Sequence, residues 1–246
     1  MTAAEVEALV LQIAPLTGQV PGDTNGILYG DRDTRITGVA VTWTPSLAVL
    51  HEAAALGLNF VLTHESAWFH YSKSSWFEVT PEEEKPANVA RRSIVDRFNM
   101  VLCQCHSNWD SVRTEGIVDS TARCLGLLVE IHSSRYMRVY ETGERTLAEL
   151  AADVKLKLGV PQVRVAGDLA MAVTRVGLAV GGLAQSCGYL DELVASGAQA
   201  VVVGEAIDYS LRVAIDSGVG LIETSHVASE NPGMRNLARL LSNALS

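Results

Sequence analysis

Residues 50–65, LHEAAALGLNFVLTHE, combine a helix-forming run with an apolar run that ends on a histidine and a glutamate. A helix is expected over residues 45–56, because Leu and Ala dominate there and Gly57 stops the run. Residues 59–63 are typical of a buried strand, and residues 36–41 form another apolar run ahead of the helix. Strand, helix and strand in this order predict a parallel sheet in an α/β fold.

The same pattern returns later in the chain. Residues 50–65 align without a gap with residues 190–205, LDELVASGAQAVVVGE, so that Glu65 falls on Glu205. Residues 100–110, MVLCQCHSNWD, similarly resemble residues 218–230, GVGLIETSHVASE, since each is an apolar run followed by a histidine and, four residues on, an acid. We interpret this as an internal duplication, although chance similarity between βα units is the alternative.

Strand and helix patterns alternate to the end of the chain. We therefore expect two related α/β halves with mixed sheets flanked by helices. The first half is placed over residues 1–126 together with the C-terminal segment, and the second over 127–246, with 127–170 as a connecting or inserted region. Two local expectations are a turn-rich loop over 21–33 and a closing helix behind Asn231-Pro232.

Composition limits the possible partners. The chain has 246 residues and a formal net charge of −9, and no dense cluster of Lys and Arg, so binding to nucleic acid is not expected. No apolar run is long enough to span a bilayer, and the N-terminal residues lack the basic start of a signal peptide. A cytoplasmic protein without membrane contact is expected.

Histidines and carboxylates follow the apolar strands at several points. Ligands of parallel α/β sheets collect at the carboxyl ends of strands, so these residues are expected to share one pocket. Imidazole and carboxylate together suit zinc, manganese, iron or nickel. Two ions roughly 3.5–4 Å apart would hold and activate a water for hydrolysis. The residues concerned are His64, Glu65, His106, Asp110, His226 and Glu230.

Each residue alone has a simpler interpretation. A histidine at a strand end is often only a hydrogen-bonding residue. Asp110 could cap the helix that follows it, and Glu230 could lie in a first helical turn for its interaction with the helix dipole. Only the conjunction of these residues favours a dinuclear metal site.

Four short motifs, taken in order, resemble the NIF-three-like family, whose members are also called GTP cyclohydrolase I type 2 homologues. The motifs are Thr63-His64-Glu65-Ser66, His106-Ser107-Asn108-Trp109-Asp110, Val203-Gly204-Glu205 and the segment from Ser225-His226 to Glu230. The resemblance implies two intertwined α/β halves, assembly into hexameric rings and two divalent metal ions per chain.

The resemblance also implies which residues bind the metals. The implied ligands are His64, Glu65, Asp110, His226 and Glu230, with His106 and Glu205 at the edge of the site. Glu65 stands where the family has a second histidine, and Ser66 where it has a proline. A carboxylate in place of an imidazole should shift preference toward manganese, iron or magnesium, but Mn, Fe, Zn, Ni and Mg are not distinguished. Catalytic and substrate-binding residues are not assigned.

These observations favour a metal-dependent hydrolase that acts on a nucleotide or another phosphorylated small molecule. The alternative is a metal-binding, metal-delivery or scaffold protein without turnover. A weaker possibility is a ring that threads nucleic acid along a local basic lining of Arg91, Arg92 and Arg97, which the net charge of −9 opposes.

Overall fold

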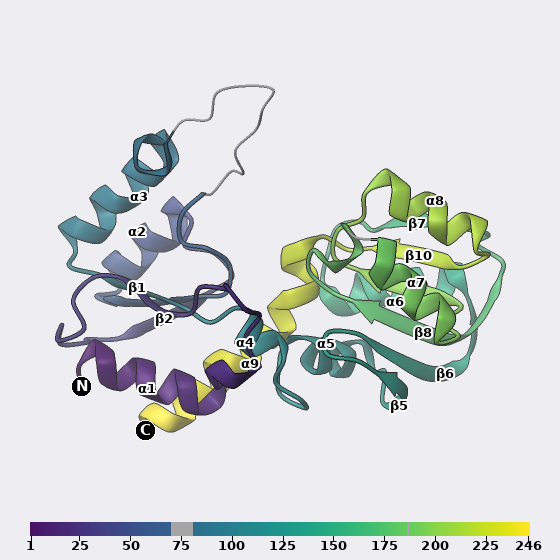
Figure 1. Ribbon diagram of the computed structural model, residues 1–246, viewed down its shortest axis with the longest axis horizontal. Coiled ribbons are helices and arrows are strands. Elements are labelled where there is room, and N and C mark those ends of the chain that lie inside the picture. The colour runs from purple at the N-terminus through teal and green to yellow at the C-terminus, as the bar shows by residue number, and fades with distance from the viewer. Residues whose placement is uncertain (70–80, 186) are drawn as a thin grey trace. The chain divides into compact units, whose positions relative to one another are not determined.

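A computed structural model describes residues 1–69, 81–185 and 187–246 (Figure 1). Contacts divide the chain into two compact units, unit 1 (Met1–Trp109 with Leu237–Ser246) and unit 2 (Asp110–Asn236). Each unit has one mixed sheet flanked by helices, so the expected α/β fold is confirmed. The domain boundaries expected from the sequence stay a prediction.

Unit 1 contains a four-stranded sheet in the order β1-β4-β3-β2. Strands β2, β3 and β4 are parallel, and β1 is antiparallel to β4. Figure 1 shows α2 and α3 on one face of this sheet and α1 on the other. The elements are α1 (Ala3–Ile13), β1 (Gly26–Tyr29), β2 (Val39–Thr42), α2 (Leu47–Ala55), β3 (Phe60–Thr63), α3 (Pro86–Arg97), β4 (Val101–Gln104) and α4 (Ser107–Asp110).

Local sequence explains the main elements of unit 1. The Thr2 hydroxyl and the Glu5 carboxylate form a capping box that begins α1, and the Ser46 hydroxyl caps α2. All residues of β3 and β4 are buried, as is typical of parallel strands covered on both faces. The apolar runs before His64 and His106 are therefore the central strands of the sheet.

Unit 2 contains a six-stranded sheet in the order β5-β6-β8-β9-β10-β7. Strands β8, β9 and β10 are parallel, and β7 is antiparallel to β10. The elements are α5 (Ile117–Leu125), β5 (Val129–Ser133), β6 (Arg138–Thr146), α6 (Leu147–Leu158), β7 (Arg164–Ala166), β8 (Ala172–Ala179), α7 (Cys187–Ala195), β9 (Ala200–Val203), α8 (Asp208–Asp216), β10 (Gly220–Glu223) and α9 (His226–Leu245).

The two sheets share one topology. Unit 1 runs α1-β1-β2-α2-β3-α3-β4, and unit 2 runs α6-β7-β8-α7-β9-α8-β10 with the same strand order and directions. Strands β5 and β6 extend the sheet of unit 2 beyond these four common strands. This shared topology is consistent with an internal duplication.

Two local expectations were wrong. The segment 21–33 contains β1, which pairs with β4 through Gly26, Ile27 and Tyr29 although turn residues surround it. The last helix begins at His226 and has Pro232 inside it. An internal proline costs a backbone hydrogen bond, but α9 also buries apolar side chains along its length, including Met234, and tertiary burial supplies most helix stability.

No helix in the described ranges has both the length and the apolar character needed to cross a membrane.

We predict unequal effects of alanine at two glycines of unit 1. Gly30 has φ +92°, and a Cβ there would lie 2.8 Å from the Met100 carbonyl oxygen, whereas Gly57 has φ +71° and no atom within 4 Å. Gly30→Ala should lower the free energy of unfolding by about 3 kcal/mol, and Gly57→Ala by about 1 kcal/mol. Urea denaturation measures both. Equal losses of unfolding free energy in the two variants would show that the backbone around Met100 can move to accommodate a Cβ at residue 30 without destabilising the protein.

Candidate metal centre

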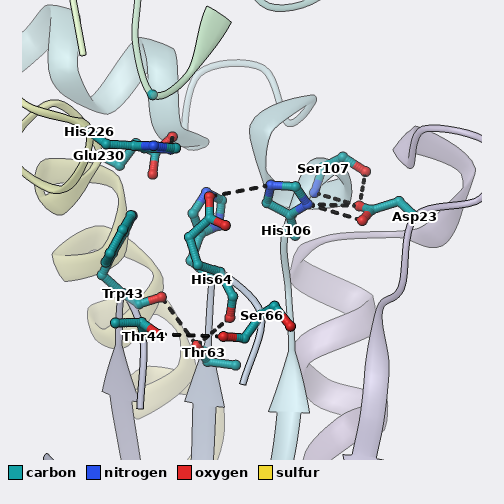
Figure 2. A network of polar contacts seen from close by, with 12 residues as sticks. Asp23, Trp43, Thr44, Thr63, His64, Ser66, His106, Ser107, His226 and Glu230 are labelled. Carbon is teal, nitrogen blue, oxygen red and sulfur yellow. Dashed lines mark hydrogen bonds and ion pairs between the residues drawn. The ribbon is translucent and has the colours of Figure 1, made fainter. Parts of the chain in front are cut away.

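The first candidate site begins where β3 stops. The Trp43 carbonyl oxygen accepts hydrogen bonds from the backbone N–H groups of His64 (3.2 Å) and Glu65 (2.8 Å). The Thr63 hydroxyl donates to the Glu65 carbonyl oxygen at 2.7 Å, and Figure 2 shows Trp43 and Thr63 side by side beneath His64. These bonds bend the chain, so that the adjacent side chains of His64 and Glu65 do not diverge as they would on a continuing strand.

His64 is buried, and the fold fixes its tautomer. Its Nδ1 lies 2.9 Å from the Cys105 carbonyl oxygen. A carbonyl only accepts hydrogen bonds, so Nδ1 carries the proton and Nε2 presents a lone pair. This arrangement is typical of metal-binding histidines, whose second ring nitrogen is held by a carbonyl or a carboxylate.

His106 is held in the same manner by a carboxylate. Its Nδ1 lies 3.1 Å from both carboxylate oxygens of Asp23 (Figure 2). Its backbone N–H donates to the Asn25 side chain at 2.7 Å. Its Nε2 lies 3.6 Å from Glu65 Oε1, and its ring centroid lies 5.1 Å from that of His64. In the neutral form of the imidazole, Asp23 therefore holds the proton on Nδ1 and leaves the lone pair on Nε2.

Asp23 accepts several hydrogen bonds besides the one from His106. The Ser107 backbone N–H donates to it at 3.1 Å, the Ser107 hydroxyl also donates, and the Thr24 N–H donates at 2.9 Å. Burial by itself raises the pKa of the Asp23 carboxyl, but the bonds from Ser107 and His106 outweigh burial and hold that pKa at about 2. Asp23 is consequently ionised at neutral pH and keeps its acceptor role.

His64, Glu65 and His106 form one group of ligand atoms. One atom from each lies within 4.8 Å of the others. Two neutral imidazoles and a carboxylate are a donor set found at zinc, manganese and iron sites. This group fits a divalent metal, and we refer to it as the unit 1 ligand group.

Unit 2 contains a second group, which surrounds the start of α9. His226 Nε2 lies 3.2 Å from Glu230 Oε1, and His226 Nδ1 lies 3.5 Å from Glu205 Oε1. His226 and Glu230 are drawn side by side in Figure 2. An Asp110 carboxylate oxygen lies within 4.8 Å of the Glu230 ligand atom. Glu230 thus lies close to both His226 and Asp110, and we refer to these three residues as the unit 2 ligand group.

Gly181 allows the backbone to approach this second group closely. It has φ +64°, and a Cβ there would lie 2.1 Å from Glu230 Oε1 and 3.0 Å from His226 Nε2. Its N–H donates to the Ser229 hydroxyl at 2.9 Å. A glycine is needed at this position because a larger residue would displace both side chains.

The residues expected from the sequence fall into these two groups. Unit 1 brings His64, Glu65 and His106 together, so His106 lies among the candidate ligands although it was expected at the edge. Unit 2 brings Asp110, His226 and Glu230 together and places Glu205 beside them.

Sequence reasoning did not assign a role to Asp23. It lies in Asp23-Thr24-Asn25-Gly26, a sequence whose only local signal is a turn, and its partner His106 is 83 residues further along the chain.

The arginines considered as a basic lining pack on neighbouring groups instead. Arg91 is buried and donates to the Ala67 carbonyl oxygen at 2.7 Å. The guanidinium groups of Arg92 and Arg97 lie 4.9 Å and 5.3 Å from the ring centroids of Trp68 and Phe98. These contacts account for the three arginines through packing and cation–π interaction.

The fold and these groups define an α/β protein with a candidate metal centre, and comparison with known proteins gives its family. The chain belongs to the Duf34/NIF3 (NGG1p interacting factor 3) family, whose model matches residues 1–246. The resemblance found in the sequence is thereby confirmed.

Known relatives and solved structures agree with this assignment. A Clostridium perfringens protein named GTP cyclohydrolase 1 type 2 homolog is 25% identical over 248 residues, covering 94% of this chain and 88% of the relative. A Nostoc protein of the same name is 28% identical over 212 residues, covering 82% and 76%. The crystal structure of a Bacillus cereus protein related to NIF3 has a TM-score of 0.85 at 15% identity, covering 100% and 93%, and thus shares the fold.

We predict that Asp23→Asn weakens metal binding without unfolding the protein. The amide keeps the shape of the carboxylate but removes the charge that holds the Nδ1 proton of His106. Loss of such a partner typically lowers metal affinity by about 10–100-fold. Competition with a chromophoric chelator measures the dissociation constant. Asp31→Asn, at an exposed turn carboxylate, is the control and should bind metal as the wild type does. Unchanged affinity in Asp23→Asn would contradict a metal-ligand role for His106.

Proposed function

We propose that this protein binds two divalent metal ions and uses them to hydrolyse a nucleotide or another phosphorylated small molecule. The proposed ligands are His64, Glu65, Asp110, His226 and Glu230, with His106 as an additional ligand. The observation that carries the proposal is the unit 1 ligand group, in which two histidines are held through Nδ1 and offer Nε2 beside a carboxylate.

The charges of the two groups support bound cations. Asp110 and Glu230 carboxylate oxygens lie within 4.8 Å of each other in unit 2, and two carboxylates at this distance repel each other. In unit 1, Glu65 Oε1 lies 3.6 Å from His106 Nε2, and one of its carboxylate oxygens lies within 4.8 Å of a ligand nitrogen of His64. A divalent cation in each group would offset this negative charge.

Bound ions would supply Lewis-acid activation of a water and of the phosphoryl group. The residues of the chain have separate tasks. Asp23 keeps the His106 ring in one orientation with its proton on Nδ1, and the Cys105 carbonyl does the same for His64. In unit 2, Glu205 lies on the Nδ1 side of His226 and is itself held by the Gln185 amide. These contacts fix the rings before any ligand arrives, which lowers the cost of assembling the site.

The family resemblance extends the proposal to assembly and location. A homo-hexameric ring and a cytoplasmic location follow from the resemblance and the composition, and both remain predictions.

Metal content tests the binding part of the proposal. Elemental mass spectrometry of protein purified without chelators should find about two ions per wild-type chain, as in two-metal hydrolytic sites. Glu65→Ala and His226→Ala should each lose metal, because each removes a ligand from one group. His51→Ala, at an exposed position of α2, is the matched control and should keep the full content. Folded variants with unreduced metal content would refute the ligand assignment.

A second candidate function is metal binding or delivery without turnover. The side chain of His226 is 20% exposed and that of Glu205 beside it is 41% exposed, so the unit 2 ligand group is open to solvent on the His226 side, whereas Glu230 is buried. Solvent access favours exchange of a bound ion with a partner or with free metal.

Turnover distinguishes the two functions. The metal-loaded wild type, assayed on phosphomonoesters, phosphodiesters and nucleotides, should hydrolyse at least one substrate class. The rate in His226→Ala should fall by a factor on the order of 100 or more, because Lewis-acid stabilisation is worth several kcal/mol. His51→Ala should retain the wild-type rate. A fully loaded wild type that exchanges metal rapidly and hydrolyses nothing on the panel would favour the delivery function.

A further inference from the structure

A cavity of about 380 Å³ opens within unit 1 beside Glu65 and His106. Its volume lies in the range of small-molecule sites, roughly 300–1,000 Å³. Besides residues of the candidate metal centre, its wall includes Leu28 on β1, Trp68 after β3 and Gln104 at the end of β4. A molecule bound there would reach the unit 1 ligand group.

Gln104 is the unusual residue of this wall. It is the last residue of β4, so its side chain lies on the same face of the strand as that of His106 two residues later. The residue is only 5% exposed and lines the cavity, and its side-chain amide forms no hydrogen bond with any residue in the described ranges. The amide is therefore left to pair with a water or a ligand that enters the cavity.

The remaining wall indicates what such a ligand carries. Leu28 and Trp68 provide apolar surface, and the side chain of Trp68 is held by an edge-on contact with Tyr29, their ring centroids 5.5 Å apart. Neither lysine nor arginine occurs among the described residues of the wall, which includes the acidic residues Asp23 and Glu65. An anionic group is therefore disfavoured beside Gln104, whereas a flat uncharged group fits the apolar surface.

We propose that Gln104 is a specificity-determining residue that recognises an uncharged, planar carboxamide or lactam group. Such a group carries an N–H donor beside a carbonyl acceptor and matches the acceptor and donors of the glutamine amide. Recognition of this group needs no turnover. One part of the inference rests on the proposed function, namely that the reacting end of the bound molecule lies at the metal ligands.

The test uses three small probes with one ring and different polar ends. Benzamide has both donor and acceptor, methyl benzoate has the acceptor alone, and benzylamine is cationic. Their dissociation constants are measured by ligand-observed NMR titration on the wild type, on Gln104→Met and Gln104→Glu, and on the control Gln12→Met in α1, whose side chain is exposed. Methionine keeps the volume of glutamine without its polar atoms, and glutamate keeps the shape without its donors.

The expected result is a preference that depends on residue 104. Wild type and Gln12→Met should bind benzamide about threefold to tenfold more tightly than methyl benzoate, as expected for a net hydrogen bond, and Gln104→Met should lose this preference. Thermal denaturation checks that Gln104→Met and Gln104→Glu are folded, and either folded variant suffices for the comparison.

Several outcomes would overturn the proposal. These are equal binding of benzamide and methyl benzoate by the wild type, a preference that survives in both variants, or tightest binding of benzylamine regardless of residue 104. Failure of benzamide to bind folded wild type would show that water alone satisfies Gln104. The metal content of Gln104→Met distinguishes failure of this inference from failure of the proposed function. This metal content should stay at the wild-type level even when the variant has lost its preference for benzamide.

Discussion

The candidate metal centre of unit 1 depends on the register between two parallel strands. Thr63 of β3 pairs with Gln104 of β4, and the Cys105 N–H extends the ladder by donating to the Thr63 carbonyl oxygen at 2.9 Å. This register places the Cys105 carbonyl where His64 Nδ1 can donate to it. A slip of one residue would turn the side chains of β4 to the opposite face and separate the two histidines. The site is thus set by the backbone of two buried strands.

Much of this could be predicted because the signals are local. Apolar runs identified β3 and β4, and the polar residues directly after them proved to be neighbours within unit 1. Asp23 could not be found in the same way, since its contact with His106 spans 83 residues. Strand β1 was missed because four residues among glycines and aspartates give no periodicity, and only pairing with β4 stabilises them.

The shared topology of the two units also shows how similar chemistry is built from different positions. His106 follows β4, and His226 follows the corresponding strand β10. Each histidine has a carboxylate on its Nδ1 side, but Asp23 precedes β1 in unit 1 whereas Glu205 follows β9 in unit 2. The corresponding strand ends therefore both carry a histidine, while the carboxylate beside it comes from a different part of each unit.

Helix α9 begins with His226 in unit 2, and from Leu237 onward its residues belong to unit 1. Leu237 and Leu241 are both buried. During synthesis on the ribosome, residues 1–109 emerge first but lack these two leucines until all of unit 2 has been translated. Unit 1 is therefore discontinuous in the chain, and its full set of contacts cannot form until residues 237–246 have emerged.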